Sequence, residues 1–136
     1  MEFVAWFTHK YIMHGALWSW HLDHHVKQPG FFEKSDRFFL VFAVPSMTSF
    51  IIGSLYSQPN ITAIGLGILA YGTAYFFVHE ILIHRRFNWF GKPKSTYLKA
   101  LVKAHQQHHT HRNKEDGECF GMLIVPQKYF NMVNNK

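Results

Sequence analysis

Ten of the eleven histidines in this chain fall into four short clusters of two alternating kinds. The first kind has two histidines separated by four residues, and the second kind has three histidines in the pattern HX2HH. Neutral imidazole serves proteins mainly as a metal ligand, a proton carrier or a pH switch. Ten imidazoles exceed the needs of one ion with about four to six ligands, so the pattern predicts two metal ions bound side by side. The candidate ligands are His9, His14, His21, His24, His25, His79, His84, His105, His108 and His109.

Helix geometry suggests how these clusters face a site. Residues three and four apart share a helix face, so the three histidines of each HX2HH cluster should point one way. Residues five apart are rotated by about 140°, so the members of an HX4H pair should splay apart. Such a pair could hold two different ions, or the helix could be locally distorted. On one continuous helix, His14, His21 and His25 would nearly eclipse and would line one wall of the site.

Several other metal sites are excluded by spacing. The motif HEILIH is one residue too long for the zinc-protease pattern HExxH. Carboxylate di-iron bundles need Glu-x-x-His pairs, and no glutamate here has a histidine three residues later. Asp23 and Glu80 adjoin candidate ligands and would either orient imidazoles or form surface salt links, and the two roles are equally favoured. His111 lies outside the pattern, and we expect it not to be a ligand.

An uncharged block over residues 39–78 must position these clusters. It predicts two membrane helices, Phe39–Tyr56 and Ile61–Val78, each about 27 Å long and joined by a short turn. Buried helices of a soluble protein are the alternative, but little chain remains to cover them. A helix over residues 1–28 should be partly embedded up to residue 20, and another should run from Ser95 or Thr96 to about His111. The predicted fold is all-α, a multi-pass membrane helical bundle formed by a single domain, residues 1–136.

The net charge of +6 is informative about topology. Basic residues flank both outer ends of the hairpin and are missing from its turn, which places both ends, and all four histidine clusters, on the cytoplasmic side of a cell inner membrane. These residues are Lys27, Lys34 and Arg37 before the first span, and Arg85, Arg86, Lys92, Lys94, Lys99 and Lys103 after the second. No basic and aromatic module indicates a nucleic-acid partner. The single cysteine, Cys119, agrees with a reducing compartment.

The cluster order, opened by HKYIMHG, resembles that of the bacterial and plant β-carotene hydroxylases. These belong to the fatty acid hydroxylase and sterol desaturase superfamily of membrane di-iron enzymes. The segments WHLDHH, FEKSD, YFFVHEILIHRRF and YLKALVKAHQQHH carry the same likeness, which covers nearly the whole chain. Family members usually have a full membrane helix before the first cluster, whereas only eight residues precede His9 here.

This resemblance implies a cytosol-facing centre of two iron ions held by the ten histidines. From the residues alone, we expect no catalytic acid or base beyond these ligands. It implies O2-dependent hydroxylation of the β-ionone ring of β-carotene at carbon 3, through β-cryptoxanthin to zeaxanthin, with electrons from reduced ferredoxin. A cationic surface of Arg85, Arg86, Lys92 and Lys94 would suit an acidic ferredoxin, or would equally serve to anchor the chain at the membrane.

Two alternatives remain open from the residues. One is a hydroxylase or desaturase of another membrane lipid, such as a sterol or a fatty acyl chain. The other is a non-enzymatic protein that binds or transports metal. A transporter would carry ligands along its midplane, whereas the centres of the two predicted spans contain none.

Overall fold

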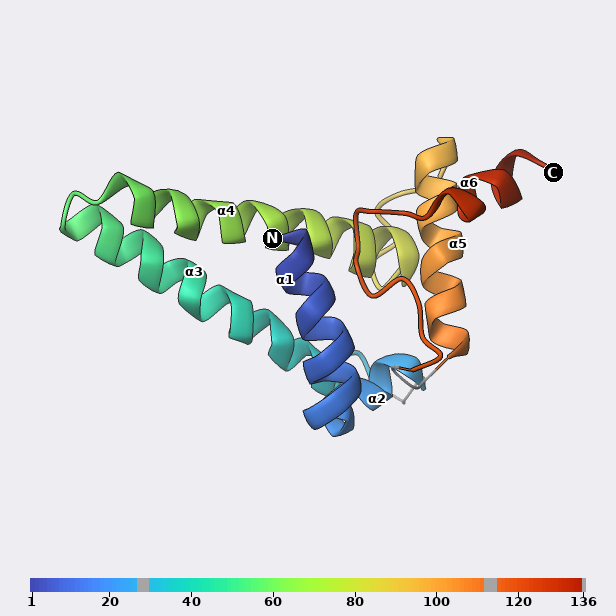
Figure 1. Cartoon of the computed structure of the whole chain (residues 1–136), viewed down its shortest axis with the longest axis horizontal. Coiled ribbons are helices and arrows are strands. Elements are labelled where there is room, and N and C mark those ends of the chain that lie inside the picture. Colours follow the sequence, from blue (N-terminus) through green and yellow to red (C-terminus); the bar gives the residue numbers. More distant parts are fainter. Residues whose placement is uncertain (27–29, 112–114, 136) are drawn as a thin grey trace.

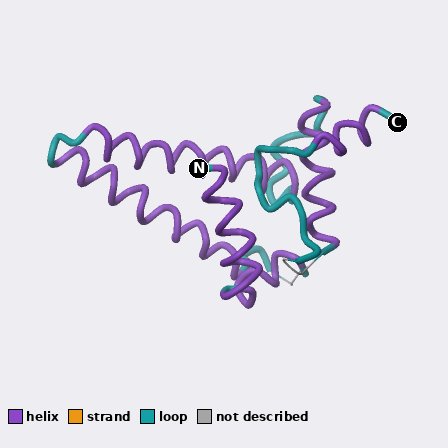
Figure 2. The backbone as a smooth tube through the Cα atoms, viewed as in Figure 1, coloured by secondary structure: helices purple, strands orange, loops and turns teal. Residues whose placement is uncertain are grey.

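The computed structural model describes residues 1–26, 30–111 and 115–135 (Figure 1). All regular structure in these ranges is helical, which confirms the all-α class (Figure 2). The elements are α1 (Glu2–Phe7), η1 (Thr8–Ala16), α2 (Trp18–His25), η2 (Lys34–Asp36), α3 (Arg37–Leu55), α4 (Pro59–Phe76), η3 (Phe77–Ile83), α5 (Thr96–Thr110) and α6 (Gln127–Asn134).

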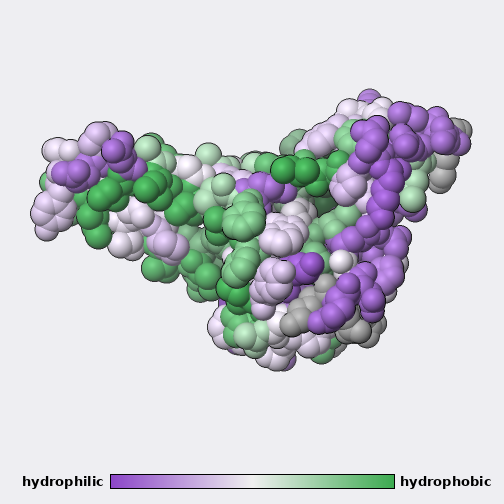
Figure 3. All heavy atoms as spheres, viewed as in Figure 1, coloured by the Kyte–Doolittle hydropathy of each residue, from purple (hydrophilic) through white to green (hydrophobic). Residues whose placement is uncertain are grey.

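Helices α3 and α4 form the predicted hairpin, which diverges from its tight turn like the arms of a V (Figure 1). Two helical stretches, Lys34–Leu55 and Pro59–Ile83, are long and apolar enough to cross a membrane. Only 17% and 6% of their most apolar windows are buried within the chain, whereas a core helix of a soluble protein would be mostly buried. Hydrophobic residues cover much of the surface of this hairpin and of α1 (Figure 3). These observations favour a membrane protein.

The arms of the hairpin are held together by small residues. A Cβ at Gly65 would lie 2.6 Å from the backbone nitrogen of Phe50 and 2.7 Å from the carbonyl oxygen of Ser46. The hydroxyl of Ser46 donates a hydrogen bond to the Gly65 carbonyl over 2.8 Å. Glycine therefore permits the close backbone approach that stabilises helix pairs in lipid.

The amino-terminal segment differs from the single helix expected over residues 1–28. Helix α1 passes into a π-helix, η1, which breaks at Gly15 (φ −117°, ψ −108°), and α2 begins only at Trp18. Because of this break, His14 and His21 lie on separate helices, and the predicted continuous helix is wrong. Residues 27–29, including Lys27 of the charge pattern, lie outside the described residues.

The second half follows the prediction more closely. Helix α4 continues through η3 and ends at His84. The side chain of Ser95 accepts a hydrogen bond from the backbone N–H of Leu98 and caps α5, as expected. Helix α6 packs on α5 through Tyr129 and Ala100.

Candidate metal centre

The structure gathers nine histidines into two neighbouring groups. Within each group, one ring nitrogen of every member lies within 4.8 Å of the corresponding nitrogens of the others. The rings of His25 and His109, one from each group, are 4.4 Å apart between centroids, so the groups share a wall. The first group consists of His9, His14, His21, His25 and His108, and the second of His24, His84, His105 and His109.

Each group takes one histidine from the other half of the chain. His24 leaves its cluster to join the second group, and His108 leaves its cluster to join the first. Adjacent residues on a helix diverge by about 100°, so the middle histidine of HX2HH faces a different direction from the histidine that follows it. The packing of the helices then places the two in different groups. The expectation that all three members of such a cluster point one way is therefore wrong.

The HX4H pairs are aligned by π-helical backbone. His9 and His14 lie in η1, and His79 and His84 lie in η3 and at its C-cap. The backbone N–H of His84 donates a hydrogen bond over 2.9 Å to the carbonyl of His79, five residues earlier. This i to i+5 bond brings residues five apart nearly into line. Of the two alternatives left open by the spacing, local helix distortion is the one observed, and His9 and His14 face the same group.

His79 lies against the second group. Its ring centroid is 4.5 Å from that of His84, 4.6 Å from His24 and 4.8 Å from His105. Its Nε2 is buried and has no hydrogen-bond partner, and the same is true of the Nε2 of His24. With His79, the second group has the same number of imidazoles as the first.

Hydrogen bonds at Nδ1 fix the orientation of three of these imidazoles. The Nδ1 atoms of His9 and His108 each lie 2.9 Å from a backbone carbonyl, those of Phe120 and Glu118. The Nδ1 of His24 lies 3.0 Å from the Glu33 carboxylate. Since Nδ1 carries the proton in these bonds, Nε2 of a neutral ring is left with its lone pair toward the group.

This arrangement fits metal ions. The Nε2 atoms of His9 and His21 are 3.0 Å apart, those of His84 and His105 are 3.0 Å apart, and those of His14 and His108 are 3.2 Å apart. Two ligands at right angles, each about 2.1 Å from one ion, would lie about 3.0 Å apart. The unpartnered Nε2 atoms of His24 and His79 would also gain a partner in this way. The two groups are therefore compatible with a di-metal site.

Burial favours the neutral form of seven of these imidazoles. Burial, reinforced by neighbouring imidazoles, lowers the pKa of His25 and His84 to about 2. Burial likewise lowers the pKa of His108 to about 3 and that of His109 to about 4. The pKa values of His9, His21 and His105 also fall far below the ordinary histidine value, with burial the largest cause. Neutral imidazole is the form that binds metals.

Aromatic rings cover the first group. Trp18 packs 5.1 Å from the ring of His14, and Phe120 packs 5.1 Å from the rings of both His14 and His108. Phe120 is itself buried. No motif or spacing in the sequence connects either aromatic residue with the metal centre.

The polar neighbours of the imidazoles differ in part from the expected ones. Glu80 accepts from Nδ1 of His79 over 2.6 Å, so its carboxylate lies where an orienting residue would be. Asp23 instead accepts a hydrogen bond from the backbone N–H of Lys34. His111 is outside both groups and lies by Thr110.

Two acidic residues and one basic residue near the site were missed as orienting groups. Glu33 and Asp36 lie in the FEKSD segment, and Arg86 is the second of the two arginines that follow His84. The sequence predicts a surface position for Arg86, either to bind a ferredoxin or to anchor the chain at the membrane. Its side chain is only 14% exposed and binds the carboxylates of Asp36 and Glu80, so it is not available to a partner.

An apolar cavity of about 340 Å³ opens beside the histidine groups. It lies between α1 and the diverging arms of the hairpin, and its walls include Ala43, Phe42 and Leu69. One end is lined by four histidines, two of the first group (His9 and His21) together with His24 and His79. A hydrocarbon held in this cavity would contact both halves of the metal centre.

Comparison with known proteins agrees with this site. The chain is 44% identical to a beta-carotene hydroxylase of Pantoea ananas over 93% of its own length and 71% of that protein. It is 42% identical to a beta-carotene hydroxylase of Pseudescherichia vulneris, over 92% and 70% of the two chains. It is 37% identical to the chloroplastic beta-carotene 3-hydroxylase 2 of Arabidopsis thaliana, over 94% of this chain but 43% of the plant protein. No solved structure matches the chain. The family model for fatty acid hydroxylases matches residues 1–130, and the chain therefore belongs to the fatty acid hydroxylase family.

Proposed function

We propose that this protein hydroxylates the β-ionone ring of β-carotene at carbon 3, giving β-cryptoxanthin and then zeaxanthin. The observation that carries the proposal is the apolar cavity whose lining includes histidines of both metal-binding groups. The bacterial and plant relatives named above supply the substrate class. All ten clustered histidines, with His79 as the fifth ligand of the second group, would hold two iron ions.

Iron suits both the ligands and the reaction. Imidazole binds iron as well as zinc, copper and nickel, so the ligand set permits it. When bound, two iron ions supply the redox chemistry that splits O2 and delivers one oxygen atom into an unactivated C–H bond. The balanced reaction is R–H + O2 + 2 e⁻ + 2 H⁺ → R–OH + H2O, and a reduced ferredoxin would supply the two electrons one at a time.

The protein would contribute binding, orientation and exclusion of water. The cavity is apolar, so it would take up a ring that carries no polar group. Phe38 and Phe42 line its wall, and the ring would sit between them and the histidine end. The polyene chain would leave through the space between the arms of the hairpin into the membrane. This placement would present carbon 3 of the ring to the centre and keep bulk water away.

The proposed enzyme would also have a defined orientation in the membrane. The two candidate membrane helices would place both ends of the hairpin in the cytoplasm of a cell whose inner membrane holds the enzyme, as the distribution of basic residues indicates. Reduced ferredoxin would then reach the centre from the cytoplasm. Residues 1–136 would act as one domain.

The decisive experiment is expression in a bacterium engineered to accumulate β-carotene. We expect pigments heavier by one and by two oxygen atoms, formed only with O2 and iron, and chromatography with mass spectrometry would identify them. The matched control is His108→Ala in the same strain. Unchanged β-carotene, with full-length wild-type protein present in the membrane fraction, would reject the carotenoid assignment.

A further inference from the structure

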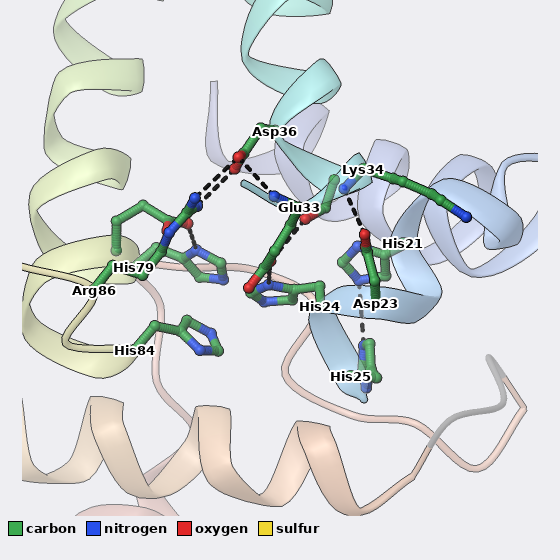
Figure 4. A network of polar contacts seen from close by, with 12 residues as sticks. His21, Asp23, His24, His25, Glu33, Lys34, Asp36, His79, His84 and Arg86 are labelled. Atoms are coloured by element: carbon green, nitrogen blue, oxygen red, sulfur yellow. Dashed lines mark hydrogen bonds and ion pairs between the residues drawn. The ribbon is translucent and has the colours of Figure 1, made fainter. Parts of the chain in front are cut away.

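One guanidinium group joins the two carboxylates that lie behind the second histidine group (Figure 4). Nη1 of Arg86 donates to Oε2 of Glu80 over 2.8 Å and to Oδ1 of Asp36 over 2.6 Å. Nη2 donates to Oδ2 of Asp36 over 2.9 Å and to the carbonyl of Phe31 over 2.6 Å. Paired, partly buried contacts of this kind are stronger and more directional than exposed ion pairs.

Each carboxylate leads to one buried imidazole. On one side, Oε1 of Glu80 accepts from Nδ1 of His79 over 2.6 Å. On the other, Oδ2 of Asp36 accepts from the backbone N–H of Glu33 over 3.0 Å, and Oε2 of Glu33 accepts from Nδ1 of His24 over 3.0 Å. Figure 4 shows the route from Arg86 through Asp36 and Glu33 to His24, with His79 next to Arg86.

The two imidazoles reached in this way share a second property. Their Nε2 atoms are buried and have no partner among the described residues. An imidazole held at Nδ1 with a free Nε2 is prepared to bind a metal ion. Arg86 therefore stands behind both of these rings, although it contacts neither.

The backbone delivers Arg86 to this position. Arg85 adopts a left-handed conformation (φ +54°) at the end of η3, and the backbone N–H of Arg86 donates to the carbonyl of Glu80 over 2.9 Å. The chain thus turns back on itself, and the guanidinium lies 5.2 Å from the centre of the Phe31 ring. This places the side chain between η3 and η2, the two elements whose carboxylates it binds.

The first group is oriented by different means. His9 and His108 are held by the backbone carbonyls of Phe120 and Glu118, and no hydrogen bond or ion pair among the described residues joins them to Arg86. A change at Arg86 should therefore act on one metal ion and not on the other.

We propose that Arg86 is a positioning residue that orients His24 and His79 and so sets the metal affinity of the second histidine group. The inference rests on the metal-binding part of the proposed function, but not on its substrate. The two histidine groups would then be oriented differently, the first by neutral backbone carbonyls and the second by ion-paired side chains.

The test is a titration of purified, metal-free, full-length protein in detergent with Co²⁺, whose visible absorbance reports its ligands. We expect the wild-type chain to bind two ions. In Arg86→Gln, one of the two affinities should fall about 10–100-fold, the usual effect of losing a group that orients a ligand, while the other stays unchanged. The weakened affinity in Arg86→Lys should lie between those of wild-type protein and Arg86→Gln, because lysine keeps the charge but cannot form the paired contact.

Combining Arg86→Gln with either of two histidine variants shows which histidine group holds the weakened ion. His14→Ala removes a member of the first group, and His84→Ala removes a member of the second. Arg86→Gln should weaken the ion that remains in His14→Ala and leave the ion that remains in His84→Ala unaffected. Arg37→Gln, at an exposed arginine next to Asp36, is the control for loss of a positive charge and should leave both affinities unchanged.

Equal weakening of both ions, or no weakening of either, would overturn the proposal. If Arg86→Gln does not accumulate as folded protein, Arg86→Lys and Glu80→Gln carry the same comparison. Because the titration uses no carotenoid, O2 or reductant, failure of wild-type protein to hydroxylate β-carotene would count against the proposed function alone.

Discussion

His24 and His25 are neighbours in the chain, yet they face different histidine groups. Their ring centroids are 6.0 Å apart, and the planes of the two rings are nearly perpendicular, at 86°. His25 packs with His14 and His21 of the first half, while the ring of His24 lies 4.2 Å from that of His84. One turn of α2 therefore serves both halves of the centre.

Replacing His108 with alanine should abolish turnover. The side chain is fully buried and belongs to the first group although it comes from α5, so its loss opens that group. We expect hydroxylation to fall at least about 100-fold and bound iron to decrease, measured by pigment analysis and by metal analysis of the purified protein. His111→Ala is the matched control at the end of the same helix and should keep wild-type activity. Normal iron content in His108→Ala would contradict the ligand role.

Acidification should weaken the fold of the metal-free protein. The pKa of His108 is lowered to about 3 and that of His109 to about 4, whereas an unfolded histidine titrates near 6.5. Between these values the unfolded chain binds more protons than the folded chain, so stability falls as the pH drops below about 6.5. Thermal unfolding in detergent from pH 8 to pH 4 should show a midpoint that is level above pH 7 and then declines. Bound metal should delay the decline, since protons must displace it. A midpoint that rises on acidification would contradict this account.

A bulky residue at Ala43 should block substrate without affecting metal. Ala43 lines the cavity, and a phenylalanine there would occupy space needed by the ring. We expect Ala43→Phe to lose most carotenoid hydroxylation while retaining wild-type iron content. The adjacent Val44 is 62% exposed and does not line the cavity, so Val44→Phe should remain active. Equal activity in both variants would show that the substrate binds elsewhere.

Alanine at Gly65 should separate the arms of the hairpin. Its Cβ would lie well inside contact distance of backbone atoms of α3, which cannot move aside as a side chain can. Overpacking of this kind typically costs about 1–3 kcal/mol, and the thermal midpoint in detergent should fall. At Gly67 a Cβ meets nothing within 4 Å, so Gly67→Ala should be neutral or slightly stabilising. Similar losses at both positions would point to a general intolerance of alanine in α4.

Loss of the Glu2 carboxylate should release the segment that follows α5. Its Oε1 accepts from three backbone N–H groups, those of Met122, Leu123 and Ile124, and its Oε2 accepts from the hydroxyl of Tyr71. Hydrogen bonds to a charged group contribute about 1.5–3 kcal/mol each, so Glu2→Ala should lower the free energy of unfolding by at least this amount. Limited proteolysis should then cut near residues 118–124. Tyr71→Phe removes only one of these bonds and should have a smaller effect; an equal effect would exclude the backbone contacts as the main support.

The sequence was sufficient to predict the hairpin and to identify the histidines that come together, because the uncharged block and the clustering of histidines are both visible along the chain. It could not predict that His24 and His108 exchange groups, since this depends on how α2 and α5 pack across the site. The π-helical backbone at the HX4H pairs was open to prediction only as one of two alternatives. The roles of Glu33, Asp36 and Arg86 depend on a left-handed turn at Arg85 that has no local signal in this arginine-rich segment.

The contacts of residues 118–124 also bear on how the enzyme is made. The carbonyls that hold His9 and His108, and the N–H groups that hold Glu2, all come from this late segment. During synthesis, both arms of the hairpin would leave the ribosome before that segment does. The nascent chain therefore carries its first histidines without their final support, and we expect metal loading to follow completion of translation.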